Sequence, residues 1–375
     1  MTSTLRFDRW ETSAGEGIVD GTVASLGRNL LYNGAMQVAQ RGTSSTGITS
    51  DGYYTADRWK TGNTTLGTWT QTIESDGPSA AGLTRSLKML CTTADSSPAA
   101  GDVLYLFQVL ESQDVTSTGK GTSDAQSLTL SFWVKSNVTG TFTGFLYDYD
   151  NTRMIAFDYS IASSGVWQKV TQTFAGDTTG AFGNDNGLGL GVFFGLAAGS
   201  NFTSGTLQTS WGADVAANRN VGQTNLAAST SNYWQVTGVQ LEAGTVATAF
   251  EHKAYGVELA ECQRYYQRIS PGLAYGSFGF AGHAGSTTAT DMDLILPVQM
   301  RVRPTSLDLS ASNHFAGSTS NALYPATNVV IQTVTASNTV MSIQLTGQSG
   351  LSVGMSQRLL ANNNASAYIG LNAEL

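Results

Sequence analysis

The feature that most constrains this fold is a series of short strand-like segments that recur between Thr68 and Glu242. Each segment is rich in β-branched and aromatic residues, and turn-forming residues such as Gly, Asn, Asp and Ser stand between the segments. Segments of this length at this spacing are typical of a β-sandwich or jelly roll. The predicted strands are 68–75, 85–93, 102–111, 126–136, 140–150, 154–161, 166–176, 187–198, 206–211 and 233–242.

The composition favours an all-β fold and excludes some functions. Charged residues make up only 12% of the chain, which contains 42 glycines, so strong helix formers are scarce. The net charge is −8 and Lys and Arg do not cluster, whereas nucleic acid requires a concentrated basic surface. We therefore expect no nucleic-acid partner. Cys91 and Cys262 are too few for a disulfide framework, and we expect both to be buried and free.

A change of periodicity between Tyr233 and Ile269 divides the chain. The first part alternates with a period of two, as in a strand, whereas the second part has large side chains at helical spacing until Pro271 and Gly272. The predicted helical face consists of Tyr255, Leu259, Cys262 and Tyr266. A chain of 375 residues is long enough for two cores. The predicted parts are an N-terminal arm at 1–27, a jelly roll at 28–250, a helical linker at 251–272 and a smaller β-sandwich at 273–375.

Two motifs precede the first regular strands. Asn33-Gly34 stands between apolar-rich runs and predicts a hairpin, the alternative being a surface loop. In the motif Asp57-Arg58-Trp59, the Trp59 ring is expected to seal one end of the core. We interpret the adjacent Asp57 and Arg58 as structural residues.

The domain junction contains the motifs VTGVQLEAG and AFEHKAYGVELAECQRYYQR, which together span 236–268. This junction resembles that of bacteriophage tail-fibre and related virion appendage proteins, in which a carbohydrate-binding-module-like jelly roll precedes a small C-terminal β-sandwich. The resemblance extends to RNLLYNGAMQVAQRG at 28–42 with ADRW at 56–59. It also includes ILPVQMRVRPTSLDLS at 295–310 and AYIGLNAEL at 367–375.

The resemblance implies a structural virion protein, most simply a tail fibre that binds host surface glycans during adsorption. It also implies a homotrimer, attachment to other virion proteins through the arm at 1–27, and display on the particle after synthesis in the host cytoplasm. The alternatives are a head fibre or capsid-decorating protein without a receptor, and a polysaccharide hydrolase. A short helix with an apolar face needs a partner surface, which is consistent with a trimer.

No catalytic residues are predicted, and we expect the chain not to be an enzyme. The histidines His252, His283 and His314 stand alone, and no nucleophile elbow, phosphate loop or dinucleotide fingerprint occurs in the sequence. The first residues lack the apolar core of a secretory signal, and the apolar run at 188–198 is too short to span a bilayer. We expect a soluble protein without membrane insertion.

A glycan site requires an exposed aromatic ring beside hydrogen-bonding side chains. Trp133, Trp167 and Trp234 occupy regular strands and are expected to be core residues. Trp211 precedes a polar stretch and is predicted to be an exposed platform, the alternative being a core ring. The predicted partners of Trp211 are Asp214, Asn218 and Arg219, and the second choice of site is Tyr147, Asp148, Tyr149 and Asp150.

The carboxylates of this second choice have three interpretations. Asp148 and Asp150 are predicted to share one strand face, with Asp158 opposite if the two strands form a hairpin. The face is then a glycan-binding patch, the acid pair of a hydrolase, or an ordinary solvated face.

An oxygen-rich turn at 176–187 is the remaining candidate for a cofactor. Its side chains are suited either to a structural calcium ion, as in many carbohydrate-binding jelly rolls, or to a turn without an ion. The candidate calcium ligands are Asp177, Asn184, Asp185 and Asn186.

Overall fold

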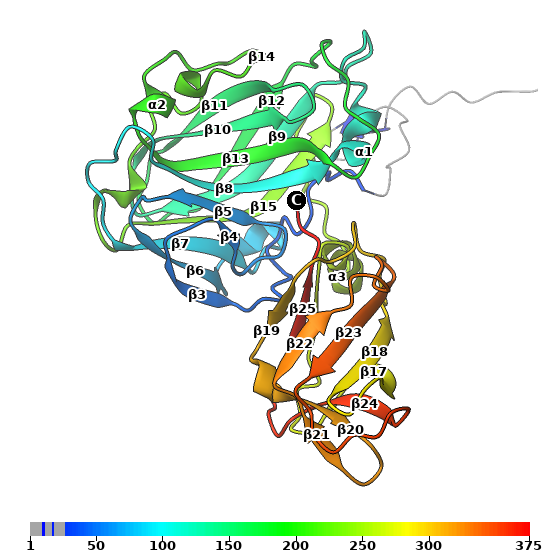
Figure 1. The fold of residues 1–375 in the computed structure, drawn as a ribbon. Helices are drawn as coiled ribbons and strands as arrows, with labels where there is room; N and C mark the ends of the chain where they lie inside the picture. Colours follow the sequence, from blue (N-terminus) through cyan, green and yellow to red (C-terminus); the bar gives the residue numbers. More distant parts are fainter. Residues whose placement is uncertain (1–9, 12–16, 19–26) are drawn as a thin grey trace, which may run out of the picture.

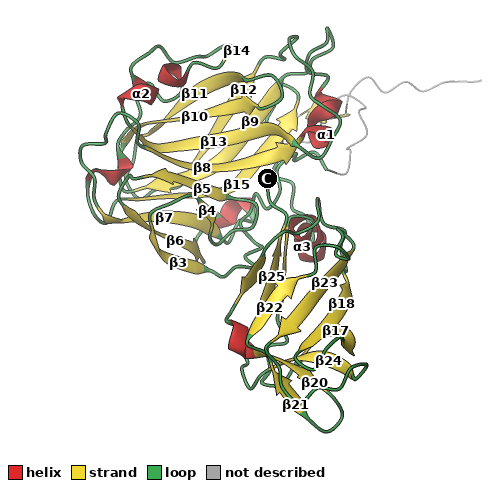
Figure 2. Cartoon of the chain, in the orientation of Figure 1, coloured by secondary structure: helices red, strands yellow, loops and turns green. Residues whose placement is uncertain are grey.

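The computed structural model describes residues 10–11, 17–18 and 27–375, which form two β-domains with few helices (Figures 1 and 2). Most of the predicted arm at 1–27 lies outside the described residues. Within the arm, the structure describes residue 27 and the strand pair β1 (Trp10–Glu11) and β2 (Gly17–Ile18). The all-β fold class is therefore confirmed.

The first domain is a sandwich of two antiparallel sheets. The seven-stranded sheet contains, in spatial order, β14 (Gly212–Ala213), β11 (Arg153–Ile161), β10 (Gly140–Asp148), β13 (Leu188–Ala198), β8 (Val103–Glu111), β5 (Lys60–Thr64) and β4 (Gly52–Tyr53). The six-stranded sheet contains β12 (Gln168–Phe174), β9 (Leu128–Ser136), β15 (Tyr233–Ala243), β7 (Ser86–Thr93), β6 (Thr68–Glu74) and β3 (Ser44–Ile48). The two sheets lie face to face in Figure 1.

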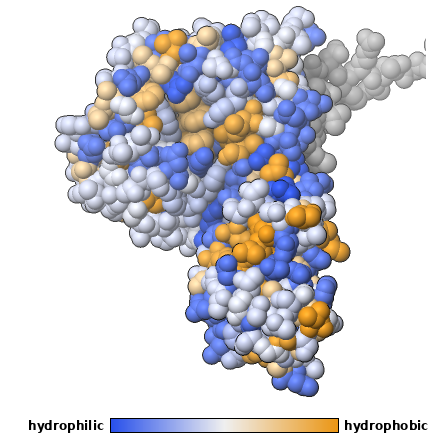
Figure 3. All heavy atoms as spheres, in the orientation of Figure 1, coloured by the Kyte–Doolittle hydropathy of each residue, from blue (hydrophilic) through white to orange (hydrophobic). Residues whose placement is uncertain are grey.

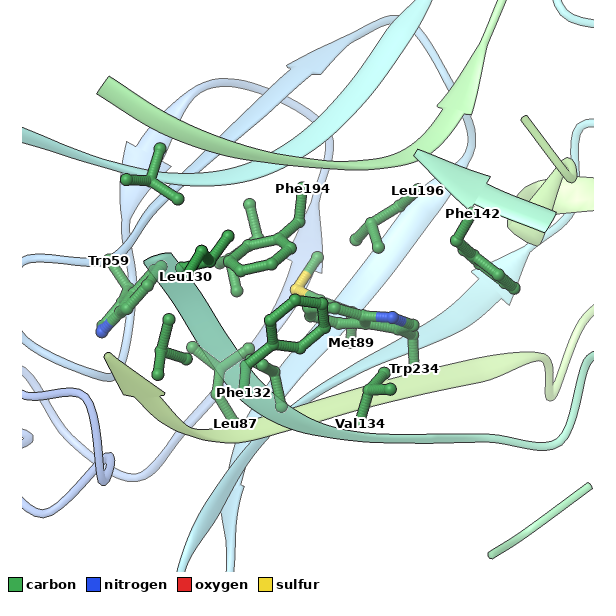
Figure 4. Close-up of a cluster of buried hydrophobic side chains, with 14 of the residues drawn as sticks. Trp59, Leu87, Met89, Leu130, Phe132, Val134, Phe142, Phe194, Leu196 and Trp234 are labelled. Carbon is green, nitrogen blue, oxygen red and sulfur yellow. The ribbon is translucent and has the colours of Figure 1, made fainter. Parts of the chain in front are cut away.

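Alternation along these strands builds the core between the sheets. Inward-facing side chains such as Phe132, Phe194 and Trp234 are buried and interdigitate (Figure 4). Nine of the ten predicted segments form strands; the exception is 206–211, which is a loop before β14. The short helices of this domain are α1 (Ser112–Val115), α2 (Ser200–Thr203), η1 (Ser79–Ala81), η2 (Thr116–Thr118), η3 (Ala216–Asn218) and η4 (Leu226–Ala228).

The predicted hairpin at Asn33-Gly34 is wrong, because no strands flank it. Asn33 is instead a buried turn residue with a positive φ of 53°. Its amide group donates to the carbonyl oxygens of Val38 and Asp57, and its Oδ1 accepts from the Val38 N–H. Trp59 is fully buried in the core, as predicted.

The helix between the domains is shorter than predicted. α3 spans only Tyr255–Gln263, and Tyr266 belongs to β16 (Tyr266–Ile269), the first strand of the second domain. The prediction that these four residues form one apolar helical face is therefore wrong: Cys262 and Tyr266 are buried within the chain, whereas Tyr255 is 59% exposed. Both cysteines are buried and free, as predicted. Within the described part of the chain, no helix is long and apolar enough to cross a membrane.

The second domain also consists of two antiparallel sheets. A three-stranded sheet contains β16, β25 (Ile369–Asn372) and β19 (Leu307–Leu309). The seven-stranded sheet contains β21 (Leu323–Pro325), β20 (Phe315–Ser318), β24 (Ser356–Ala361), β17 (Ser277–Ala284), β18 (Ala289–Ile295), β23 (Val340–Thr346) and β22 (Asn328–Ile331). The short helix η5 (Ser312–His314) precedes β20. Phe278, Phe315 and Ile369 are among the buried residues of its core.

A polar junction joins the two domains near the C-terminus (Figure 1). Glu111, at the end of β8, receives two hydrogen bonds from Arg264 at 2.6 and 2.7 Å and one from the Tyr265 hydroxyl at 2.6 Å. Burial alone would raise the pKa of Glu111, but these hydrogen bonds outweigh burial and hold the pKa below its usual value. The Glu111 carboxylate is therefore ionised and fixed at neutral pH.

Candidate functional site

A row of stacked aromatic rings crosses the outer face of the seven-stranded sheet. Phe107 on β8, Phe193 on β13 and Phe145 on β10 point away from the core because they alternate with inward-facing residues. Phe193 stacks on Phe107 with ring centroids 4.6 Å apart and on Phe145 at 4.5 Å. Figure 3 shows hydrophobic residues gathered over this part of the first domain.

Cations lie at both ends of this row. The Lys60 ammonium is 5.6 Å from the centre of the Phe107 ring. At the other end, the Arg219 guanidinium is 5.7 Å from the Phe145 ring and 5.6 Å from the Tyr147 ring. These distances allow cation–π attraction, which holds the ring at each end of the row beside its charged group.

The Arg219 end carries the candidate site, which we call the tyrosine site and define as Tyr147, Tyr149, Asp214 and Arg219. The two tyrosines are half-buried and their rings meet edge to face, 4.8 Å apart. Asp214 holds Arg219 through an ion pair, with Arg219 Nε donating to Asp214 Oδ1 at 2.9 Å. The structure thus brings together four residues that are up to 72 positions apart in the sequence.

The tyrosine hydroxyls of this site remain protonated at neutral pH. Burial and then the Asp214 carboxylate raise the pKa of Tyr147 above its ordinary value. Burial, together with Tyr147, raises the pKa of Tyr149 to about 12. The site therefore presents phenolic donors, a guanidinium and a carboxylate beside aromatic surface, which suits a ligand with CH faces and hydroxyl groups.

The structure separates Trp211 from the residues that were predicted to bind a glycan together with it. Trp211 is not an exposed platform: it is half-buried, packs against the core and donates its indole N–H to the Ala175 carbonyl at 2.9 Å. Asp214 and Arg219 belong to the outer face instead. Asn218 lies between these two regions and accepts a hydrogen bond from the Thr206 N–H at 2.9 Å, so its side chain holds the loop.

Trp211 lines a cavity of about 390 Å³ between β11 of the seven-stranded sheet and the edge strand β12 of the six-stranded sheet. Polar side chains dominate its wall, and we call it the edge cavity. Its lining includes Arg153, Asp158, Gln172, Thr173, Asp177, Thr179, Thr209, Ser210 and Trp211.

The predicted carboxylate face is wrong for Asp148. Its side chain points inward, is fully buried, and accepts a hydrogen bond from Lys120 Nζ at 2.5 Å. Asp150 is exposed but accepts from Ser112 and the Gly183 N–H, both at 2.9 Å, and so closes a loop. Asp158 pairs with Thr143 in the hairpin, five residues from the pair formed by Asp148 and Arg153.

Asp148 and Asp158 consequently cannot form an acid pair. Five residues of strand separate them by about 17 Å, and their side chains point to opposite faces of the sheet. Glycoside hydrolysis requires two carboxyl groups within roughly 10 Å.

Three of the four candidate calcium ligands have other partners. Arg153 Nε donates to Asp177 Oδ2 at 2.8 Å, and the Lys120 ammonium lies 3.3 Å from the same oxygen. Asp185 accepts from the Gly187 N–H at 2.8 Å, and Asn186 donates to the Arg301 carbonyl. Across residues 10–11, 17–18 and 27–375, no group of three or more His, Cys, Asp or Glu side chains is arranged to hold a metal ion.

Comparison with known proteins gives structural matches of low identity. No protein-family model and no curated protein matches the chain. The tailspike protein 4 enzymatically active domain of bacteriophage CBA120 is 12% identical, with a TM-score of 0.32. That match covers 58% of this chain and only 21% of the tailspike chain.

Two carbohydrate-binding modules also match. TmCBM61, solved with β-1,4-galactotriose, is 7% identical over 58% of this chain and 99% of its own, with a TM-score of 0.29. The family 11 module from Clostridium thermocellum, solved with a β-1,3-1,4-mixed-linked tetrasaccharide, is 10% identical over 56% of this chain and 98% of its own, with a TM-score of 0.27. At these scores the matches do not indicate which residues of this chain bind a ligand.

Proposed function

We propose that this protein is a non-enzymatic bacteriophage virion component, a tail fibre or similar appendage, that binds host surface glycans through the tyrosine site. The observation that carries the glycan part is the half-exposed Tyr147 ring beside the Arg219–Asp214 pair. A sugar ring offers CH groups to an aromatic surface and hydroxyls to charged hydrogen-bonding groups on its rim. All of these groups stand on strands or on a loop held by an ion pair, so little order is lost on binding.

The virion part of the proposal rests on the sequence. The stretch at 236–268, where β15 leads into α3, resembles the domain junction of tail-fibre and related appendage proteins. This resemblance supports display on the particle, a homotrimeric assembly, and attachment to other virion proteins through residues 1–27. The buried, cation-paired Asp148 gives no support to a hydrolase, because a catalytic carboxylate must reach its substrate.

The test is substitution of Tyr147 by Ala, with binding measured on a glycan array and by adsorption to host cells. Loss of an aromatic anchor typically weakens binding by about 1 to 3 kcal/mol, which is roughly 5- to 150-fold. Tyr233→Ala is the matched control, because Tyr233 is also half-buried and has the Lys88 ammonium 5.0 Å from its ring, but it lies on the other sheet.

The two variants separate the proposed function from its main alternative. A receptor-binding protein loses glycan binding in Tyr147→Ala and keeps it in Tyr233→Ala. A head fibre or capsid-decorating protein shows no specific glycan binding with either variant or with the wild type, and that result would overturn the proposal.

A further inference from the structure

A second hollow lies on the opposite side of the first domain, on the outer face of the six-stranded sheet. Its volume is about 290 Å³, near the lower end of the range for small-molecule sites, so it accommodates a single sugar-sized ring. We call it the tryptophan hollow. Its lining residues are Ala81, Ser131, Trp133, Lys169, Gly238, Ala249, Phe250 and His252.

Trp133 provides aromatic surface in this hollow. Its position in β9 predicts a core ring, but alternation with the buried Phe132 and Val134 places it on the outer face, where it is half-exposed. The indole lies against Gly238, at the β-bulge of β15. Gly238 has a φ of +61°, and a Cβ there would lie 3.2 Å from Trp133 Cδ1 and 2.5 Å from Leu83 Cδ1. A side chain at this bulge would clash first with Leu83 and would also crowd the indole, and the positive φ favours glycine.

The wall opposite the sheet is also held in place. The Phe250 and His252 rings meet edge to face with centroids 5.0 Å apart, and His252 Nε2 lies 3.2 Å from the Ala81 carbonyl oxygen. The segment that carries both rings is tied to β15, because the Glu251 N–H donates to Gln240 Oε1 at 2.8 Å. The hollow is therefore built before a ligand arrives.

The charge of the hollow is opposite to that of the chain as a whole. Lys169 on β12 is the register partner of Trp133 on β9, so its exposed side chain stands beside the indole. None of the eight lining residues, all in the described part of the chain, is acidic, although the net charge of the protein is −8. Lys135 on the same face differs from Lys169, since it is paired with Asp76. A surface of this kind favours an anion that also carries a flat apolar face.

We propose that the tryptophan hollow binds one carboxylated sugar residue. The CH face of the pyranose packs on Trp133, and its carboxylate lies toward the Lys169 ammonium. This site is separate from the tyrosine site and uses the other sheet of the sandwich, so either site can bind without the other.

The experiment compares methyl β-D-glucuronide with methyl β-D-glucoside by ligand-observed NMR titration of the full chain. We expect the glucuronide to bind about fivefold more tightly, because its carboxylate forms an ion pair with the exposed Lys169. Lys169→Gln should remove this preference while leaving the thermal midpoint unchanged. Lys88→Gln is the matched control, since Lys88 lies beside the Tyr233 ring of the same sheet.

The proposal would be overturned by equal affinities for the two glycosides, by an unchanged preference in Lys169→Gln, or by no measurable binding of the glucuronide. Trp133→Ala should weaken the binding of both glycosides, and Tyr147→Ala should affect neither. If Tyr147→Ala alone abolishes glucuronide binding, the acidic sugar binds the tyrosine site and the tryptophan hollow is not a site.

Discussion

The Arg58 guanidinium and the Glu374 carboxylate form a buried ion pair that joins the first domain to the next-to-last residue of the chain. The Arg58 side chain is fully buried and that of Glu374 is 4% exposed. Arg58 also donates to the Val109 carbonyl at 2.6 Å and lies 3.4 Å from the centre of the Tyr265 ring. The end of the chain therefore completes the environment of a charge that the first domain buries.

Substitution of Glu374 by Gln should destabilise the protein and loosen the domain junction. The change leaves the buried Arg58 charge without a counter-ion, and breaking such a pair typically costs about 3 to 5 kcal/mol. Chemical denaturation should show a lower free energy of unfolding and a separate transition for the second domain. Asp158→Asn is the control for the change in net charge, because Asp158 is exposed. Equal stability of the two variants would show that the pair does not hold the junction.

Asp57 should make the stability of the protein fall between pH 4 and pH 6. Burial raises the pKa of Asp57 from 3.8 to about 6, although Arg41 and hydrogen bonds from Gln40 oppose the shift. The folded state therefore binds a proton that the unfolded state has already lost in this range. The stabilisation from the protonated carboxyl is complete below pH 3.8 and is lost as the pH rises through about 6.

The measurement is the free energy of unfolding of the wild type relative to Asp57→Asn across this pH range. Comparison with the Asn variant cancels the carboxylates whose pKa lies below the usual value, such as Glu111 and Asp177. The difference should change by roughly 3 kcal/mol from pH 4 to pH 7. A difference that is independent of pH would mean that Asp57 titrates normally.

Nine strand positions of the first domain were readable from the sequence, but the exposed face of each strand was not. In β8, Tyr105 and Phe107 alternate with Leu106 and Leu110, so both faces are apolar and the period of two cannot tell which one meets the other sheet. The same ambiguity made Trp133 a predicted core residue, although it lies on the outer face. Which face of a strand is buried depends on how the two sheets pack together. The alternation within one strand does not reveal this.

Long-range partners explain the other errors. Asp148 follows the polar pattern of a solvated strand end. However, Lys120, which is 28 positions earlier in the sequence, pairs with the Asp148 carboxylate and so offsets the cost of burying its charge. Tyr266 matches the helical period of Tyr255 and Leu259, but it pairs with Asn372 in the three-stranded sheet. Tertiary pairing ended the helix three residues before the local pattern did.

Trp211→Ala should destabilise the first domain moderately and leave glycan binding intact. The half-buried ring packs against the core and makes a hydrogen bond to Ala175, so its loss should cost about 2 kcal/mol of unfolding free energy. Trp211→Phe keeps most of the packing without the N–H donor and should lose less. Thermal unfolding and glycan-array binding of both variants are the measurements. Reduced glycan binding at unchanged stability would show that Trp211 and the edge cavity belong to the glycan site.

The last prediction concerns assembly, for which the exposed part of α3 is the relevant surface. Glu258 accepts a hydrogen bond from the Asn33 N–H and Cys262 is buried, so one side of the helix is fixed to the rest of the chain. The first turn leaves Tyr255 and Val257 exposed at 59% and 53%. Tyr255 and Val257 are two residues apart and therefore point to different sides of α3, so each offers a separate apolar surface to another copy of the chain.

We expect light scattering of the purified protein to give three chains per particle, the state implied by its resemblance to tail-fibre proteins. The double substitution Tyr255→Ser with Val257→Ser should then shift the particle toward single chains, because it removes the apolar contact without touching the buried side of α3. Val334→Ser is the control, since Val334 is 94% exposed in the second domain and its loss should leave the mass unchanged. A single chain per particle for the wild type would refute the trimer, and a trimeric double variant would place its interface away from α3.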